Sequence, residues 1–487
     1  ACDFPRIYAQ YQERLARSGC LDFGDLIVRS VRLLQGSPPL ARAVRDRFRV
    51  ILVDEYQDSN LAQLDLLEQL HEPANYLCVV GDEDQSIYSF RGAELSNILH
   101  FAEHFPGTRI VRLEENYRST QNILEVATRV VEHNRERLGK TLWTRKSAGA
   151  PVTLTHVETP EEEAQYCARL LEDGRLGETA ILYRMNFQSR VFESLFARVG
   201  IPFRVVGTAR FYEREEIKDA LAYLALLANP RDELALRRAL SKPRRGLGAK
   251  TIETILGERG GGDLLESARR AAGSLGRKAS AALSGFLAVM ADLRRQLDSE
   301  PPGSLSDVVH HLIMQSGLVD HYRERDQGEG TGRVDNLDEL VNATSEYAGN
   351  GEGLGAFLET LLLNSTEEDP FRHTEQVTLI TVHNTKGLEF DRVIITGLED
   401  GIFPHYASTL GGVPVAGSEL EEERRLFYVA VTRAREELYL ASCRQRRIFG
   451  RLQTMEPSRF LAEIPPEHLR VLGRAAPGPD TGEEKQA

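Results

Sequence analysis

Seven short runs of β-favouring residues alternate along the chain with longer segments of helical character. These runs are rich in Val, Ile and Leu and cover residues 50–53, 76–80, 109–113, 179–183, 376–382, 392–396 and 438–442. Parallel strands need a long crossover connection, so this alternation is typical of a parallel sheet with helices on both faces. The sequence therefore predicts an α/β fold.

The pattern changes between residues 218 and 375, which are rich in Ala, Leu, Arg and Glu with helical periodicity. Glycine-rich breaks interrupt the periodicity at residues 260–262 and 327–332. Because β-favouring runs resume afterwards, we expect two α/β domains, of which the second contains this segment as a helical insertion. Residues from about 473 onward have no apolar periodicity and are expected to be a disordered tail.

Composition narrows the class of protein. The 487 residues include five scattered cysteines without a CxxC pair, so neither a disulfide framework nor a zinc site is expected. No apolar run approaches the length of about 20 residues that a membrane span requires, and a reducing cytoplasm fits best. The net charge of −13 argues against general coating of nucleic acid. A protein that binds nucleic acid can nevertheless confine positive charge to one groove.

The strongest chemical signal is at residues 51–58, where an apolar run ends in Asp54 and Glu55. In a nucleotide hydrolase, one carboxylate at a strand end holds Mg²⁺ and the next directs the attacking water. The alternative is an ordinary strand that runs into an acidic turn. Two further strings follow runs of the same kind: GDEDQSIYSFRGA at residues 81–93 and ENYRST at residues 115–120.

In this order and spacing the three strings resemble motifs II, III and IV of superfamily 1 DNA helicases of the UvrD/PcrA/Rep type. Residues 183–190, 382–390 and 421–434 resemble later motifs of that family, including V and VI. The resemblance implies two RecA-like parallel-sheet domains, the first only partial. It places the end of domain 1B at 1–24, domain 1A at 25–114, domain 2A at 115–217 and 376–465, helical domain 2B at 218–375, and a tail at 466–487.

The resemblance also implies roles in binding ATP and Mg²⁺. Asp54 would hold Mg²⁺, Glu55 would orient or deprotonate water, and Gln85 would sense the γ-phosphate. Arg118 and Arg433 would stabilise the transition state as arginine fingers. The residues implied to bind the rest of the nucleotide are Tyr117, stacked on adenine, Glu389, bonded to the ribose, Lys386 and Gly387.

For DNA, the resemblance implies that Tyr88 and Phe90 stack on single-strand bases. Neighbouring contacts to the backbone or bases would come from Arg91, Arg184, Asn186 and His383. Most relatives carry Trp where this chain has Phe90, which is expected to weaken stacking. The pair Asn384 and Thr385 also departs from the small residues usual in motif V.

Two further segments resemble duplex-contacting features of these helicases. In residues 242–251, the proposed DNA contacts are Arg245, Gly246, Gly248 and Lys250, and the alternative is a plain basic helix cap. Residues 446–450 contain a glycine suited to a hairpin tip, with Phe449 expected against the terminal base pair. A merely structural hairpin is the alternative there.

The chain contains no phosphate-binding loop of the form G-x4-G-K-[ST]. Its only GKT is residues 139–141, and Asn134 stands where the first glycine is needed. Since residues 3–19 also resemble a helix already under way, we expect the chain to be an N-terminally incomplete helicase.

The leading hypothesis is an ATP-dependent 3′–5′ DNA helicase of bacterial cytoplasm, monomeric or weakly dimeric, acting in repair or replication. Its partners would be single-stranded DNA, duplex junctions and DNA repair proteins. The literal chain is expected to be inactive in hydrolysis. The alternatives are a non-hydrolysing DNA-binding fragment and, less expected, a RecB/AddA-like helicase-nuclease subunit, which would need a C-terminal nuclease domain.

Overall fold

The computed structural model describes residues 4–17, 20–207, 209–257, 263–329, 332–364, 375–405, 417–448 and 451–472. The chain divides into two compact units, which are described separately. The first comprises Ala1–Tyr117, Ala127–Arg145 and Ala416–Val429, and the second comprises Arg118–Val126, Lys146–Val415 and Ala430–Ala487. Among the described helices, none has the length and apolarity needed to cross a lipid bilayer.

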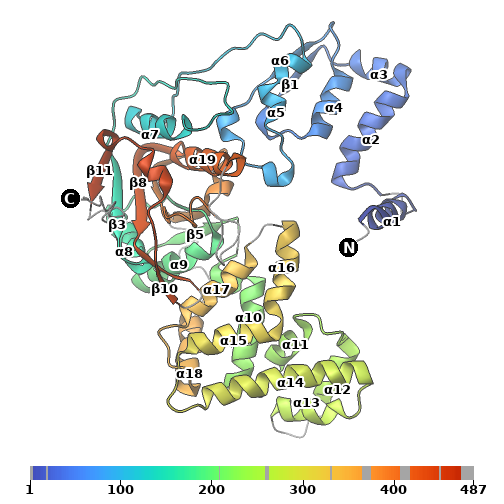
Figure 1. Ribbon diagram of the computed structural model, residues 1–487, viewed down its shortest axis with the longest axis vertical. Helices are drawn as coiled ribbons and strands as arrows, with labels where there is room; N and C mark the ends of the chain where they lie inside the picture. The colour runs from blue at the N-terminus through green and yellow to red at the C-terminus, as the bar shows by residue number, and fades with distance from the viewer. Residues whose placement is uncertain are drawn as a thin grey trace, which may run out of the picture. The chain divides into compact units, whose positions relative to one another are not determined.

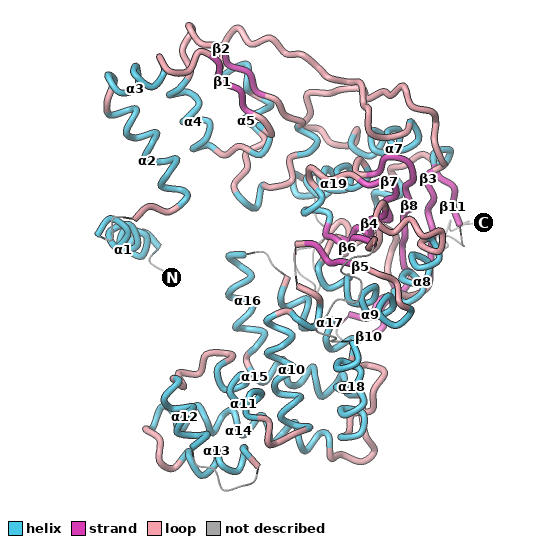
Figure 2. Tube along the Cα trace, turned by 180° about the vertical axis from the view of Figure 1, so that it is seen from behind, coloured by secondary structure: helices cyan, strands magenta, loops and turns pink. Residues whose placement is uncertain are grey.

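The first unit is built around two parallel strands, β1 (Val50–Val53) and β2 (Tyr76–Val79), which pair with Val50 opposite Tyr76. The connecting helix α4 (Leu61–Leu70) begins with a capping box in which Asn60 and Gln63 satisfy each other's backbone amides. Leu64 and Leu67 of α4 pack with Tyr56 in the core of this unit. Val53 at the end of β1 (Figure 1) pairs with Val79 at the end of β2 (Figure 2), so the two strands end side by side, at the points where the acidic motifs begin.

The remaining helices of the first unit are mostly short. They are α1 (Phe4–Arg17), α2 (Phe23–Gly36), α3 (Pro38–Arg45), α5 (Ser96–Leu99), α6 (Phe101–His104), the C-terminal half of α7 (Gln121–Val131) and most of α19 (Ser418–Val431). Helix α1 confirms the helix expected near the N-terminus.

The prediction of a strand at residues 109–113, in the first unit, is wrong. Residues 109–113 form no strand and pair with no other described strand, and Ile110, Val111 and Leu113 are exposed. Instead, the Arg112 side chain donates to the carbonyl of Gly139 at 2.9 Å. A β-favouring composition indicates only that the side chains would pack well in a sheet. A strand also needs a neighbouring strand to hydrogen-bond with, and composition does not show whether one is present.

The second unit contains a seven-stranded sheet in the order β11-β3-β8-β7-β4-β6-β5. All six neighbouring pairs are parallel. The strands are β3 (Val152–Val157), β4 (Thr179–Tyr183), β5 (Phe203–Val206), β6 (Val377–Thr381), β7 (Phe390–Ile395), β8 (Ala434–Cys443) and β11 (Leu469–Leu472). Every residue of β4 and β6 is buried, as expected for a parallel sheet covered on both faces. The predicted parallel α/β fold is confirmed.

Helices α8 (Pro160–Leu170) and α9 (Ser189–Val199) pack against this sheet through a core that includes Ile181, Phe192 and Phe196. Helix α8 begins at a Thr159 cap and has proline at its start, which suits a helix N-terminus. The short helix α20 (Arg459–Ala462) precedes β11. Residues 469–472 lie within the segment expected as a tail (466–487) but form β11, which pairs with β3.

The helical insertion is confirmed between β5 and β6, which are neighbours in the sheet (Figure 2). Nine helices fill the described part of this segment: α10 (Glu215–Ala228), α11 (Glu233–Ser241), α12 (Ala249–Gly257), α13 (Leu264–Ala272), α14 (Arg277–Leu297), α15 (Leu305–Ser316), α16 (Leu318–Glu329), α17 (Arg333–Ala343) and α18 (Gly351–Asn364). They share one hydrophobic core, in which Tyr223, Phe286 and Tyr322 are among the largest buried side chains. The insertion thus has enough apolar surface to stabilise itself.

Helix α17 carries two carboxyl groups with raised pKa values. Burial, together with Asp335 and Glu339, raises the pKa of Asp338 to about 8, and burial with Asp326 raises that of Asp335 to about 6. The ordinary Asp pKa in an unfolded chain is about 3.9, so folding favours the protonated form of Asp338 at intermediate pH. The stability that this proton provides is present below about pH 4 and is lost as pH rises toward 8.

We therefore expect Asp338→Asn to raise the melting temperature at pH 8 and to change it little at pH 4. Asparagine keeps the shape of the protonated carboxyl group but never pays the cost of burying a charge. Thermal unfolding of both proteins between pH 4 and pH 9 measures the effect. Asp307→Asn, a similar change on α15, is the control, and equal responses of the two variants at pH 8 would contradict the assignment.

Candidate functional site

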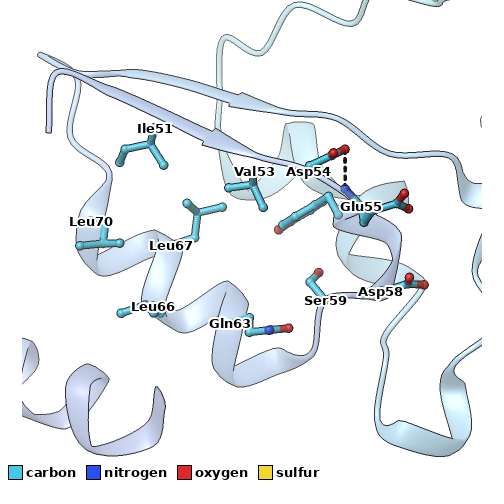
Figure 3. Close-up of a pocket in the computed structure, with 11 residues that line it drawn as sticks. Ile51, Val53, Asp54, Glu55, Asp58, Ser59, Gln63, Leu66, Leu67 and Leu70 are labelled. Carbon is cyan, nitrogen blue, oxygen red and sulfur yellow. Dashed lines mark hydrogen bonds between the residues drawn. The ribbon is translucent and has the colours of Figure 1, made fainter. Parts of the chain in front are cut away.

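Strand β1 ends in the two acids that the sequence singled out. The Glu55 amide donates to Asp54 Oδ1 at 2.8 Å, and both side chains are exposed at the strand's carboxyl end (Figure 3). Glu55 has φ of 52°, the only positive φ of a non-glycine residue in the described parts of the chain. Such a left-handed conformation costs about 1–3 kcal/mol and is kept where surrounding structure imposes it.

Gln57 supplies part of that constraint. Its side chain is fully buried, its Nε2 donates to Glu55 Oε2 at 2.6 Å, and its Oε1 accepts from the Asp82 amide at 3.0 Å. Gln85 in turn donates from Nε2 to Asp82 Oδ2 at 2.8 Å. The ends of β1 and β2 are thereby joined in one chain of hydrogen bonds from Glu55 to Gln85.

Gly81 makes this junction sterically possible. A Cβ atom at this position would lie 2.6 Å from Gln57 Oε1 and 2.8 Å from Ile98 Cδ1, closer than such atoms approach each other. Sequence analysis did not single out Gln57 or Gly81, although both lie inside the strings that identified the site.

A pocket of about 350 Å³ lies beside the two acids, between β1 and α4 (Figure 3). Its walls are mainly apolar, with Leu66, Leu67 and Leu70 on one side, and the Asp54, Glu55 and Asp58 carboxylates lie at one end. Carboxylate oxygens are the ligands that Mg²⁺ prefers. None of the eleven lining residues is Lys or Arg, so the only charged side chains of the pocket are the three carboxylates.

The loop after Gln85 presents an aromatic pair. Tyr88 and Phe90 have ring centroids 6.0 Å apart, and Phe90 is 59% exposed. The Arg91 guanidinium lies 5.3 Å from the Tyr88 ring and 5.4 Å from the Phe90 ring. Tyr88 is partly buried, and the exposed Phe90 ring beside a cation suits stacking on nucleic acid bases. Tyr117, the expected adenine platform, is also exposed, and its hydroxyl donates to Glu115 Oε2 at 3.0 Å.

In the second unit, Glu389 lies between two arginines. Arg118 Nε is 2.5 Å from Glu389 Oε2, and Arg435 Nε is 3.1 Å from Oε1. Hydrogen bonds from Arg118, and to a smaller extent from Arg435, lower the pKa of Glu389. Sequence reasoning missed Arg435, which is two residues beyond Arg433. The expected roles of Arg118 and Glu389 toward nucleotide stay predictions, since here the two side chains bind each other.

Arg433 is buried, with 2% of its surface exposed, and donates to the Leu388 carbonyl and to Thr432 Oγ1, both at 3.2 Å. The turn before β7, which contains Leu388, also contains Lys386, which is partly buried, and Gly387, which has φ of 82°. The expected arginine finger Arg433, which precedes β8, is thus bonded to the turn before β7 that contains the expected nucleotide-binding residues Lys386 and Gly387.

The remaining expected DNA contacts of the second unit come from other turns. His383 lies in the short helix η6 (Val382–Thr385). Arg184 directly follows β4, and Asn186, two residues further on, begins η4 (Asn186–Gln188). The Asn186 carbonyl accepts from Arg214 Nη1 at 3.0 Å, which fixes the turn to the helical insertion.

In the helical insertion, Arg245 is directed into the fold. It donates to the Ala239 carbonyl at 2.8 Å, to the Ser316 carbonyl at 2.9 Å and to the Tyr223 hydroxyl at 2.5 Å. Gly246, with φ of 76°, Gly248 and Lys250 are exposed beside it. In this conformation Arg245 supports the turn, and its expected contact with DNA stays a prediction.

The expected hairpin is present as antiparallel strands β9 (Gln445–Ile448) and β10 (Arg451–Thr454), with Ile448 opposite Arg451. Phe449, the expected separation residue, lies outside the described residues. At the base of the hairpin, Arg446 Nε is 2.6 Å from Glu399 Oε2, and its Nη2 is 2.9 Å from Glu163 Oε2. All three side chains are buried.

Lys140 of the GKT string is not available to a phosphate in this structure. Its Nζ contacts Asp82 and lies 3.0 Å from Asp84 Oδ2 and 4.0 Å from Glu83 Oε2. These carboxylates neutralise the ammonium group, which agrees with the sequence argument that residues 139–141 are not a phosphate-binding loop.

Two family models match this chain in succession. Residues 2–106 match the UvrD/REP helicase N-terminal domain, and residues 111–268 and 279–445 match the UvrD-like helicase C-terminal domain. The chain belongs to the UvrD-like helicase family. The resemblance seen in its motifs is therefore confirmed.

UvrD-like relatives match almost the whole chain. DNA helicase II of Escherichia coli is 39% identical over 95% of this chain and 65% of its own length. ATP-dependent DNA helicase UvrD1 of Mycobacterium tuberculosis is 40% identical over 97% and 65%, and ATP-dependent DNA helicase PcrA of Staphylococcus epidermidis is 38% identical over 95% and 64%. The chain thus spans about 65% of the length of these curated relatives.

Proposed function

We propose that this UvrD-like chain is the motor part of an ATP-dependent DNA helicase that moves 3′ to 5′ on single-stranded DNA. The observation that carries the proposal is the hydrogen-bonded chain from Glu55 through Gln57 and Asp82 to Gln85, at the carboxyl ends of adjacent parallel strands. It links a candidate water-activating carboxylate to the loop that presents the aromatic pair. The names of the relatives, DNA helicase II and PcrA, support the same activity.

In this proposal Asp54 would hold Mg²⁺ and Glu55 would orient or deprotonate the attacking water. Gln85 senses the γ-phosphate, while Arg118 and Arg433 offset its negative charge in the transition state. Bound MgATP supplies the reacting phosphate and the metal's positive charge. The nucleotide-holding residues are Tyr117, Glu389, Lys386 and Gly387.

DNA binding in the proposal centres on the exposed Phe90 ring, with Tyr88 and Arg91 beside it. Further contacts to single strands come from Arg184, Asn186 and His383. The turn containing Gly246, Gly248 and Lys250, with Arg245 behind it, binds the duplex arm of a junction, and Phe449 meets the terminal base pair. We place the protein in the bacterial cytoplasm as a monomer or weak dimer that acts in DNA repair or replication, with DNA repair proteins as partners.

Hydrolysis and DNA binding have different requirements. Hydrolysis needs a loop whose backbone amides and lysine hold the phosphates, and no such string occurs in the 487 residues. Stacking on the aromatic pair needs no such loop. We therefore propose that the chain by itself binds single-stranded DNA and does not hydrolyse ATP.

The test compares the chain with a version preceded by a strand, a G-x4-G-K-[ST] loop and a helix taken from a UvrD-like relative. We expect both versions to bind fluorescent oligo(dT), and only the longer one to hydrolyse ATP in a DNA-stimulated manner. Replacing the loop lysine with alanine is the control. Hydrolysis by the shorter chain would place the phosphates elsewhere, and absence of oligo(dT) binding by both versions would contradict the proposed DNA role.

A further inference from the structure

Three consecutive acids, Asp82, Glu83 and Asp84, lie at the start of the loop that leads to the aromatic pair. Asp84 is fully buried and Glu83 is 6% exposed. Burying a carboxylate is costly unless an opposite charge and hydrogen bonds accompany it. The loop can therefore hold this position only while other segments supply those partners.

The first partner segment is residues 134–140. Arg137 binds Asp84 through two bonds of 2.7 Å, from Nε to Oδ1 and from Nη2 to Oδ2. Lys140 contacts all three acids, and the Leu138 amide donates to Glu83 Oε1 at 3.2 Å. Burial raises the pKa of Asp84, but Arg137 and Lys140 outweigh it and hold that pKa below its ordinary value.

The second partner segment is helix α19. Arg425 Nε donates to the Ser86 carbonyl at 3.0 Å, and the Ser89 amide donates to Glu422 Oε1 at 3.1 Å. These bonds lie on either side of Ile87 and Tyr88, so they fix the backbone from which the aromatic residues extend.

The two segments are also bonded to each other. Arg424 Nη1 donates to Asn134 Oδ1 at 2.6 Å, and Asn134 Nδ2 donates to the Glu421 carbonyl at 3.0 Å. Each of these bonds, like those above, lies within the first unit. Residues 134–140 and 421–425 therefore surround the loop as one connected polar frame, which we call the loop clamp.

We propose that the loop clamp positions residues 82–91 for binding single-stranded DNA, with Lys140 and Glu422 as positioning residues that do not touch the DNA. The proposal rests on the DNA-binding role proposed above for Phe90 and Arg91. Because α19 ends two residues before Arg433, the clamp also gives a covalent route from a candidate phosphate-binding arginine to the DNA-binding loop.

A salt series separates positioning from direct contact. A lysine that binds a phosphate releases a counterion, so its removal lowers the slope of log affinity against log salt by about 0.7 for single strands. Lys140 is occupied by carboxylates and its removal leaves that slope unchanged. We expect Lys140→Met to weaken oligo(dT) binding on the order of tenfold at every salt concentration, since stacking on an aromatic ring is worth about 1–3 kcal/mol per base.

Two comparison variants frame this experiment. Lys278→Met changes an exposed lysine of α14 and leaves both affinity and slope as in the unchanged chain. Arg91→Met lowers the slope, because Arg91 is proposed to contact DNA directly. Fluorescence anisotropy with labelled oligo(dT) at four or five salt concentrations gives both quantities.

Amide hydrogen exchange without DNA tests the clamp independently of the proposed function. In Lys140→Met, the amides of residues 82–91 exchange faster while those of the second unit keep their protection. If the single variant unfolds, the double variant Lys140→Met with Asp82→Asn removes the uncompensated charge as well and is measured in its place.

Unchanged affinity and unchanged exchange in Lys140→Met overturn the proposal, as does a fall in salt slope equal to that of Arg91→Met. If the unchanged chain binds no oligo(dT), the proposed DNA function fails. In that case, faster amide exchange at residues 82–91 in Lys140→Met would still show that the loop clamp orders this loop. Unaltered exchange would overturn the clamp as well.

Discussion

Replacing Arg446 with methionine is expected to lower the free energy of unfolding of the second unit by about 3–5 kcal/mol, the typical cost of breaking a buried ion pair. Its guanidinium binds Glu399 and Glu163 at the base of the β9–β10 hairpin, and all three side chains are buried. The two carboxylates also accept from the Cys443 amide at 2.6 Å and the Gly397 amide at 2.9 Å. Methionine would fill the space but leave two carboxylates without a cation.

The free energy of unfolding lost in Arg446→Met is expected to become smaller as pH falls. Burial already raises the pKa of Glu399, although Arg446 acts to lower it. Without Arg446 that pKa rises further, so the carboxyl group takes up a proton in mild acid and no longer needs a partner. Urea unfolding at pH 5 and pH 8, followed by circular dichroism, measures both effects.

Arg447→Met is the matched control, because Arg447 is the next residue of the same strand and its side chain is exposed. Its unfolding free energy should change by less than about 0.5 kcal/mol, as for most surface substitutions. Equal losses in the two variants would mean that the hairpin, rather than the buried ion group, is responsible.

Glu55→Gln is expected to lower DNA-stimulated ATP turnover by about 10²–10⁴-fold in the version of the protein that carries a phosphate-binding loop, the usual contribution of a general base. Glutamine has the same size and retains an oxygen that can accept the bond from Gln57 Nε2. The left-handed turn at position 55 is therefore kept, while the group that accepts the proton from water is lost. Nucleotide affinity should remain within about threefold, because Glu55 is proposed to act on water rather than on the phosphates.

A coupled-enzyme assay gives turnover, and titration with a fluorescent ATP analogue gives affinity. Glu103→Gln removes the same charge from an exposed position on α6 and should leave both unchanged. Turnover by Glu55→Gln equal to that of the unchanged protein would transfer the role of base to another carboxylate, for which Asp58 in the same pocket is a candidate.

Much of the fold could be predicted because its signals are local. The buried strands β4, β6 and β7 appear in the sequence as apolar runs, and the insertion appears as a long segment of helical periodicity. Both patterns arise because the faces that are buried carry apolar side chains. Strands β3, β5 and β11 were not predicted. The segment 109–113 has the composition of a strand yet is not one, since strand formation depends on a neighbour that composition does not encode.

The candidate site divides in the same way. Sequence alone determined the family, the parallel α/β class and the positions of Asp54, Glu55 and Gln85, because motif spacing and strand ends are written along the chain. Only the tertiary structure decided that Lys140 faces three acids, that Arg245 is bonded into its turn, and that Glu389 pairs with Arg118 and Arg435. Charged side chains take the partners that folding brings within a few ångströms, and those partners come from segments distant in sequence.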